Sequence, residues 1–270
     1  SKGRKLIGWD EILEGGLAPE ATVMSWRGES GGIKSARMGH DVVMTPGNYM
    51  YFDFYQADPK TQPYAIGGYT PIKKVYSYNP IPVDSLTAEE SKHIMGVQAN
   101  TWTEYIPNEQ HLEYMMFPRA LALAEIAWSP QEKREWNDFK PRMNAHISKL
   151  QQMGINTFTL SDELEVTMKV DTVSKQIEVY LDAEKYPAEI RYTTDGTVPT
   201  ASSTVYDGMI QVKDSAYIKA AIFSNGQLQG TPTEKKVDYH RAINKPIHYN
   251  SKLYPGYMAG GMNALLDGYR

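Results

Sequence analysis

The 270 residues are enough for one large domain or two modest ones, and 41% hydrophobic and 22% charged residues are typical of a chain that folds around a core. A formal net charge of -4 gives no reason to expect nucleic acid or an anionic membrane as a partner. The chain has no cysteine, which excludes disulfides, thiolate metal sites and a cysteine nucleophile, and its apolar runs are too short to span a bilayer.

The first 155 residues alternate between short apolar runs and helical patterns. The runs are bounded by Gly, Pro or polar residues, which favours buried strands, and they cover residues 6–9, 21–26, 41–45 and 93–98. Residues 31–39 between the second and third runs predict a compact helix closed by Gly39. Strands that alternate with helices predict parallel βαβ units and an α/β fold.

Two helical segments follow. Residues 111–128 are strongly apolar, and Pro118 requires a kink or a break there. Ser129, Pro130 and Glu132 predict the start of a second helix with a capping box. Its apolar residues recur at spacings of three and four and predict one buried stripe: Trp136, Phe139, Met143, Ile147 and Leu150. Pro141 is a candidate break at Asp138, and Gly154 ends the segment.

From about residue 163 to 240 the pattern becomes all-β. Residues 165–170 and 176–180 alternate apolar with polar side chains, and Asp195-Gly196 and Asn225-Gly226 are turn signals after strands. Short strands at this spacing predict a small antiparallel sandwich. The residue pattern changes again near residue 243, which suggests the first stretch of a third domain.

Four motifs place an aromatic beside a charged residue at, or just past, the end of a predicted strand. They are Gly8-Trp9-Asp10-Glu11, Ser25-Trp26-Arg27-Gly28, Tyr51-Phe52-Asp53 and Asn100-Thr101-Trp102-Thr103-Glu104. In a parallel α/β barrel the carboxyl ends of the strands meet on one face, where active sites lie. The four motifs together therefore predict a pocket for a polyhydroxylated ligand.

These motifs, in this order, resemble the family-20 β-N-acetylhexosaminidases. The resemblance extends through the helix Phe117-Pro118-Arg119-Ala120-Leu121-Ala122-Leu123-Ala124-Glu125-Ile126-Ala127-Trp128. It implies that residues 1–155 are the C-terminal half, strands five to eight, of a TIM (β/α)8 barrel. Residues 163–240 resemble the small β-sandwich that follows the barrel in many bacterial members. Residues 243–270 resemble the start of a discoidin-like (F5/8 type C) β jelly roll.

The resemblance implies hydrolysis of terminal non-reducing β-linked N-acetylhexosamine by substrate-assisted retaining catalysis, in which the substrate's acetamido oxygen attacks the anomeric carbon. It assigns Tyr51 as the donor to that oxygen. It assigns a substrate-binding box to Trp9, Trp26 and Trp102, and acceptors for the O4 and O6 hydroxyls to Asp53 and Glu104. The implied partners are glycans with a terminal N-acetylhexosamine.

The family's general acid and its aspartate partner stand in a His-Xaa-Gly-Gly-Asp-Glu motif, which these 270 residues lack. We therefore expect a C-terminal fragment that is inactive alone, with the pair lying upstream. Asp10-Glu11 is an adjacent acidic pair, but the tryptophan before it matches the fifth-strand motif. We expect a structural role for it, capping and anchoring the loop into Ile12 and Leu13. Ser161-Asp162-Glu163 is interpreted as a solvated linker.

Two alternatives stay open: a non-catalytic carbohydrate-binding or accessory role, and a lacto-N-biosidase type of specificity, for which residues 64–69 would shape the mouth. The six histidines lack metal-ligand spacing and no phosphate-binding glycine loop occurs, so we expect no metal and no cofactor. Family members with this domain order are commonly exported, which suggests a periplasmic, outer-surface or secreted location. Nothing in the sequence indicates an oligomeric state.

Overall fold

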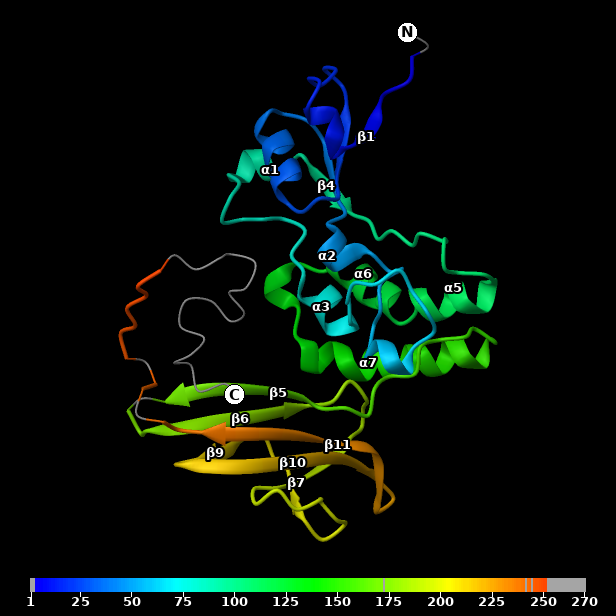
Figure 1. The fold of residues 1–270 in the computed structure, drawn as a ribbon. Helices are drawn as coiled ribbons and strands as arrows, with labels where there is room; N and C mark the ends of the chain where they lie inside the picture. The colour runs from blue at the N-terminus through cyan, green and yellow to red at the C-terminus, as the bar shows by residue number, and fades with distance from the viewer. Residues whose placement is uncertain (1–2, 172, 241, 244, 252–270) are drawn as a thin grey trace. The chain divides into compact units, whose positions relative to one another are not determined.

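The computed structural model describes residues 3–171, 173–240, 242–243 and 245–251, and the chain divides into two compact units at Thr159 and Leu160. The first unit is α/β and the second is all-β (Figure 1). In the described residues, no helix has the length and apolar character that crossing a membrane demands. Most of the stretch expected to begin a jelly roll, residues 243–270, lies outside the described residues.

The first unit contains one four-stranded sheet in the order β1-β2-β3-β4, with every neighbouring pair parallel. Its strands are β1 (Ile7–Trp9), β2 (Thr22–Ser25), β3 (Val42–Met44) and β4 (Ile94–Val97). The helical elements are η1 (Asp10–Leu13), α1 (Ser30–Arg37), α2 (Gly47–Met50), η2 (Pro59–Thr61), α3 (Ile72–Ser77), α4 (Ala88–Ser91), α5 (Glu109–Met116), α6 (Arg119–Trp128), η3 (Gln131–Lys133) and α7 (Trp136–Gln152). The four predicted strands, their parallel pairing and the helix after the second strand are confirmed.

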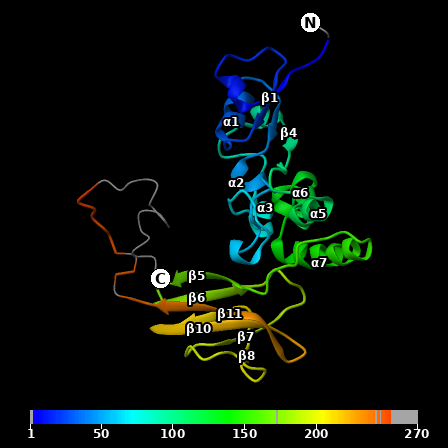
Figure 2. The same ribbon diagram turned by 45° about the vertical axis from the view of Figure 1, so that its right-hand side comes forward.

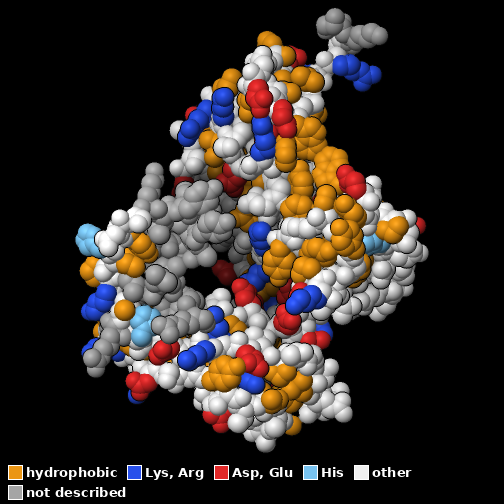
Figure 3. Space-filling model, in the orientation of Figure 1, with side chains coloured by type: hydrophobic (Ala, Val, Ile, Leu, Met, Phe, Trp, Pro, Cys, Tyr) orange, Lys and Arg blue, Asp and Glu red, His pale blue; other side chains and the backbone are white. Residues whose placement is uncertain are grey.

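One face of this sheet is covered by α1. Val23, Val42 and Met44 are completely buried beneath the helix. A Cβ added at Gly32 would lie 2.5 Å from the sulfur of Met44, so the helix approaches the strands closely only because this residue has no side chain. On the opposite face Met24 and Val43 stay partly accessible, and Ile7 at the edge is 61% exposed. Figure 3 shows hydrophobic side chains gathered over the β1 and β4 side of this unit.

Of the remaining helices, α3 packs against α6 and α7 (Figure 2), and α4 contacts α1. Tyr76 of α3 stacks on Phe139 of α7 with ring centroids 4.5 Å apart. Phe139, Met143 and Ile147 of the predicted stripe are buried, and each contributes on the order of 2 kcal/mol by burial, whereas its two end residues, Trp136 and Leu150, are half-buried. Arg142 of α7 makes a two-pronged ion pair with Glu125 of α6.

Two details of these helices differ from the sequence prediction. Pro118 does break the segment, since α5 ends at Met116 and α6 begins at Arg119. The capping box at Ser129 is wrong: Ser129 is extended, Pro130 precedes the 3-10 turn η3, and the long helix begins only at Trp136. Pro141 does not split that helix. It is the sixth residue of α7, beyond the first turn, so the helix continues through it with the loss of one intrahelical hydrogen bond.

The second unit consists of two antiparallel sheets, in the orders β11-β10-β7-β8 and β5-β6-β9. Its strands are β5 (Glu165–Asp171), β6 (Gln176–Asp182), β7 (Glu189–Thr193), β8 (Thr204–Val205), β9 (Ile210–Val212), β10 (Ser215–Ser224) and β11 (Gln227–Asp238). Alternate residues Ile177, Val179 and Leu181 of β6 share one core with Ile218 and Ala220 of β10. The strands predicted from alternation are therefore confirmed.

The turn predicted at Asn225-Gly226 is also confirmed, because it joins β10 to β11. Both residues have positive φ, 51° and 74°, as a two-residue hairpin loop with right-handed strand twist requires. By contrast, Asp162 is not a purely solvated linker residue, since its carboxylate pairs with Lys185 at 2.5 Å.

Candidate active site

The aromatic residues of the four sequence motifs come together at the carboxyl end of the parallel sheet. Trp26 stacks with Tyr51 at a centroid distance of 6.3 Å, and Tyr51 meets Trp102 edge to face at 6.5 Å. Trp102 in turn lies 5.9 Å from Trp9. The four rings thus form a continuous aromatic wall across the ends of β1 to β4. Trp102 is 42% exposed, so this wall faces solvent along part of its length.

Tyr51 holds its place because the backbone beyond β3 continues to pair with the backbone beyond β4. Tyr51 and Asn100 form a parallel bridge, and the amide of Phe52 donates to the carbonyl of Asn100 at 2.7 Å. The Asn100 side chain is buried and donates to Thr45 Oγ1 at 2.7 Å. Burial raises the pKa of the Tyr51 hydroxyl, although hydrogen bonds from Trp102 and Asn100 act in the opposite direction. At neutral pH this hydroxyl therefore keeps its proton and can donate it to a ligand oxygen.

The carboxylates of Asp10 and Glu11, the acidic pair that follows Trp9, accept hydrogen bonds from other residues of the protein. Asp10 is only 2% exposed and accepts from Arg27 Nε at 2.6 Å and from the Arg27 amide at 3.2 Å. A Cβ at Gly31 would lie 2.9 Å from the Asp10 Cβ, so this packing requires a glycine there. Both carboxylate oxygens of Glu11 accept from Trp26 Nε1 at 3.0 Å.

These hydrogen bonds refine the expected structural role of Asp10 and Glu11. They do not cap the helical turn η1, whose N-cap is Trp9 without a side-chain bond. Instead they orient the neighbouring motif, Asp10 through Arg27 and Glu11 through the indole of Trp26. The hydrogen bond from Trp26 also lowers the pKa of the exposed Glu11, which is the opposite of what a general acid needs.

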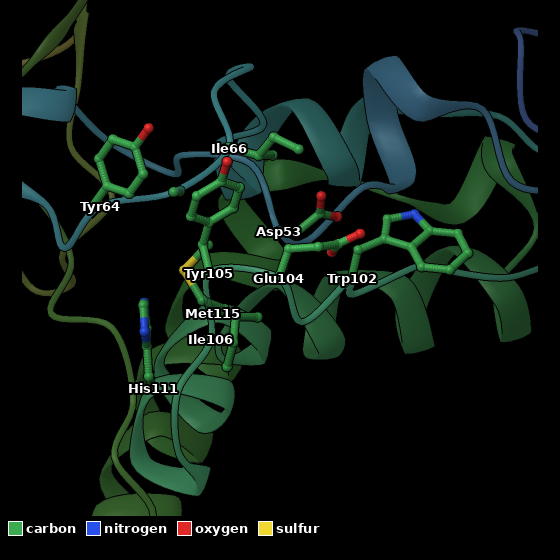
Figure 4. A pocket seen from close by; sticks show the side chains of 10 residues that line it. Asp53, Tyr64, Ile66, Trp102, Glu104, Tyr105, Ile106, His111 and Met115 are labelled. Atoms are coloured by element: carbon green, nitrogen blue, oxygen red, sulfur yellow. The ribbon is translucent and has the colours of Figure 1, made fainter.

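Asp53 and Glu104 lie in a different environment from Asp10 and Glu11. Asp53 is 5% exposed, and its Oδ1 atom has no hydrogen-bond partner in the described part of the chain. Burial raises the pKa of the Asp53 carboxyl, the charge of Glu104 adds to this, and the nearby Arg119 opposes it. In Figure 4 the carboxylates of Asp53 and Glu104 point toward one another, with Trp102 on one side and Tyr105 on the other. A buried carboxylate oxygen without a donor is costly, so it needs a specific reason to be there.

A narrow crevice continues from these two carboxylates. It is lined by Asp53, Tyr64, Ala65, Ile66, Trp102, Glu104, Tyr105, Ile106, His111 and Met115, and it is too narrow for a water molecule. Tyr64 and Tyr105 meet edge to face across it, at 5.1 Å. The sequence placed residues 64–69 at the mouth of the site, and Tyr64 and Ile66 do line this crevice. Three aromatic residues of its lining are exposed, namely Tyr64, Trp102 and Tyr105.

Arg119 is the residue beneath the site that the motifs did not single out. It is fully buried, and its guanidinium donates to the carbonyls of Phe52, Phe54, Thr70 and Met115. Its position after Phe117-Pro118 at a helix start would have predicted an exposed cation. Only the three-dimensional structure brings residues 52, 54 and 70 to it. Among the described residues no three His, Cys, Asp or Glu side chains cluster as a metal site would require.

The comparison with known protein families covers both units. Residues 1–131 match the family model described as "Glycosyl hydrolase family 20, catalytic domain". Residues 168–234 match the one described as "Chitobiase/beta-hexosaminidase C-terminal domain".

Individual relatives agree with these matches. A β-hexosaminidase of Porphyromonas gingivalis is 42% identical over 226 residues, which cover 83% of this chain and 29% of that protein. A β-N-acetylhexosaminidase of Cellulomonas fimi is 30% identical over 147 residues, covering 53% of this chain and 29% of that one. Both relatives are thus far longer than the part that this chain spans.

A solved structure is similar as well. It is the family-20 exo-β-N-acetylglucosaminidase of Vibrio harveyi in complex with N-acetylglucosamine. The similarity has a TM-score of 0.53 at 31% identity, and it covers 58% of this chain and 25% of that one.

Proposed function

Since the chain belongs to glycoside hydrolase family 20, we propose that it forms the sugar-binding part of a β-N-acetylhexosaminidase. This enzyme removes terminal β-linked N-acetylglucosamine or N-acetylgalactosamine from glycans. Both relatives named above carry this activity in their names, and the Vibrio harveyi structure was solved with N-acetylglucosamine. The proposal concerns a whole enzyme of which this chain spans about 29% by comparison with its relatives.

The finer proposal for the fold is that β1 to β4 are the fifth to eighth strands of a (β/α)8 barrel. Three observations support it. The sheet order follows the chain order with every pair parallel, and all four aromatic motifs lie at the carboxyl ends of the strands. The partly exposed apolar face opposite α1 is the face that a closed barrel would turn inward. For the residues from 243 onward, a discoidin-like jelly roll stays a prediction.

The observation that carries the functional proposal is the orphaned oxygen of Asp53 beside an aromatic wall. A sugar hydroxyl is a neutral donor of the right size for Asp53 Oδ1, which has no donor among the described residues, and a hydrogen bond to a charged acceptor is among the strong ones. We assign Asp53 and Glu104 to the O4 and O6 hydroxyls of the terminal sugar. Trp9, Trp26 and Trp102 present flat apolar faces of the kind on which a pyranose ring and its acetamido group pack.

Tyr51 is the proposed donor to the acetamido oxygen. In substrate-assisted hydrolysis this oxygen attacks the anomeric carbon, the glycosidic bond breaks, and an oxazolinium ion forms while a general acid protonates the leaving oxygen. A protonated Tyr51 amid the aromatic wall can orient the acetamido group for that attack. We propose that the general acid and its aspartate partner come from outside residues 1–270, because Asp10 and Glu11 are bound to Arg27 and Trp26.

The test compares two aryl substrates with the full-length protein. We expect it to hydrolyse p-nitrophenyl N-acetyl-β-D-glucosaminide and to leave p-nitrophenyl β-D-glucoside intact, because only the first carries the acetamido nucleophile. Equal turnover of both substrates would contradict the substrate-assisted mechanism. Residues 1–270 alone should show no turnover. Turnover by this chain that disappears in Asp10→Asn or Glu11→Gln would instead make that pair catalytic.

A further inference from the structure

Arg119 and Asp53 are both buried ionisable residues, yet they come from segments 66 residues apart in the sequence. Arg119 is 0% exposed and Asp53 is 5% exposed. A lone buried charge of either sign would destabilise the folded state by several kcal/mol. Each of the two therefore needs partners, and the contacts of Arg119 show what kind it has.

In the described part of the chain, the Arg119 guanidinium donates its hydrogen bonds to backbone carbonyls. Nη1 donates to Phe54 at 3.0 Å and to Thr70 at 3.1 Å, Nη2 donates to Phe52, and Nε donates to Met115 at 3.1 Å. The guanidinium carbon also lies 4.9 Å from the ring centre of Phe52. Arg119 thus ties the start of α6 to three other segments of the first unit.

Two of these carbonyls belong to the residues on either side of Asp53. The planar guanidinium of Arg119 therefore binds the backbone immediately before and after Asp53. These hydrogen bonds set the direction in which the Asp53 carboxylate points. A lysine could not span these acceptors, because its ammonium group is a compact point charge. Among the described residues, no carboxylate accepts a hydrogen bond from Arg119, and its positive charge acts on Asp53 electrostatically.

We propose that Arg119 is the positioning residue for Asp53: its hydrogen bonds to the carbonyls of Phe52 and Phe54 fix the backbone that presents the carboxylate to a sugar hydroxyl, and its positive charge favours the ionised form. This inference rests on the sugar-binding role proposed above for Asp53. Arg119 itself touches no ligand. Its effect on the ligand passes through the Asp53 backbone and charge.

Other ionisable groups also face this pair and bear on its pH dependence. Glu104 follows β4 and raises the pKa of Asp53, and the charge of Asp53 in turn contributes to the raised pKa of Tyr51. From α5, Tyr114 interacts with Arg119, and the neutral His111 lines the same crevice. Burial lowers the pKa of Arg119 to about 9, with Asp53 and Tyr114 opposing, so Arg119 still carries its proton at neutral pH.

The first experiment uses NMR on the full-length protein and leaves Arg119 unchanged. The Arg119 Nε resonance should shift as Asp53 is protonated, with the same pH midpoint as the Asp53 carboxyl carbon. In Asp53→Asn this titration should disappear. An Arg119 Nε resonance that does not shift when Asp53 is protonated, or that titrates equally in Asp53→Asn, would overturn the proposal. This outcome does not depend on sugar binding, so it separates the inference from the proposed function.

The second experiment measures affinity for N-acetylglucosamine against pH in Arg119→Lys, which keeps the charge and loses the fork. We expect binding to weaken about tenfold, the equivalent of one displaced hydrogen bond to the sugar, with the pH midpoint near the wild-type value. Arg119→Met should also move that midpoint upward. Arg142→Lys is the matched control, since Arg142 pairs with Glu125 and contacts neither residue flanking Asp53. Wild-type affinity and midpoint in a folded Arg119→Met would contradict the proposal.

Discussion

Two acidic pairs lie at the strand ends of the first unit, and they differ in what satisfies them. Asp10 and Glu11, next to β1, accept hydrogen bonds from Arg27 and Trp26. Asp53 and Glu104, beyond β3 and β4, border a crevice, and the buried Asp53 Oδ1 accepts no hydrogen bond from any residue that the structure describes. The first pair is adjacent in sequence and resembles a catalytic dyad. The second pair is 51 residues apart in the sequence, in two separate motifs, and the fold brings the two carboxylates together.

The difference separates residues that build a site from residues that receive a ligand. A carboxylate whose oxygens are already satisfied stabilises its neighbours, and replacing it should affect folding or the orientation of Trp26. A carboxylate with an unsatisfied buried oxygen destabilises the folded state and is useful only when a ligand donates to it. The four substitutions below, in order of decreasing expected effect, test whether this division holds.

Tyr51→Phe removes a hydrogen-bond donor from the residues that receive the ligand. We expect turnover of the aryl N-acetylglucosaminide by the full-length protein to fall on the order of a hundredfold, by analogy with loss of one oxyanion-hole donor. Binding should weaken much less, because the hydrogen bond strengthens as charge develops on the acetamido oxygen. Steady-state kcat and KM measure this. Tyr49→Phe is the control, since Tyr49 stacks on Tyr78 away from the wall. An equal loss in both variants would refute the assignment.

Asp53→Asn should separate binding from stability. Affinity for N-acetylglucosamine should fall about thirtyfold, through loss of a charged acceptor worth about 2 kcal/mol. Stability should change in the opposite direction. Burial raises the pKa of Asp53 above its unfolded value, so the ionised form opposes folding at neutral pH and the amide removes that cost.

The stability gain of Asp53→Asn should disappear as the pH falls below about 4, where the carboxyl is protonated in both states. Titration calorimetry and urea unfolding at several pH values measure the two effects. Asp58→Asn, which changes an exposed cap of η2, serves as the control. If Asp53→Asn destabilises the protein at pH 7, Asp53 belongs with the structural pair.

Asp10→Asn probes the site-building side. The amide keeps the size of the carboxylate but loses the charge that Arg27 binds at 2.6 Å, so the variant should be destabilised by about 1.5 kcal/mol. Urea unfolding measures this, with the exposed Asp138→Asn as the control. Loss of activity without loss of stability would show that Asp10 acts on the substrate.

Glu11→Gln should have the smallest effect. Its amide oxygen can still accept from Trp26 Nε1, so sugar affinity should stay within about twofold of the wild-type value, as for most changes of an exposed charge. Glu11→Ala removes the acceptor and should broaden the Trp26 indole resonance. A large loss of affinity in Glu11→Gln alone would place Glu11 among the ligand-binding carboxylates.

Several elements followed from short stretches of sequence. The four strands, the helix after the second one and the Asn225-Gly226 turn were predicted, because apolar periodicity and glycine act over a few residues. The start of α7 was not. Ser129, Pro130 and Glu132 satisfy the capping pattern, yet the backbone stays extended at Ser129, and Trp136 begins the helix where it packs beside Phe139 and Tyr76. In that case packing overrode a local signal.

The candidate site divides in the same way. The motifs alone indicated that Trp9, Trp26, Tyr51 and Trp102 stand at neighbouring strand ends, because parallel strands bring their carboxyl ends to one edge. Only the tertiary structure decided which carboxylates are already satisfied, and that Arg119 lies buried beneath Asp53. Hydrogen bonds and burial depend on atoms from segments 15 to 67 residues apart, and no local pattern encodes such distances.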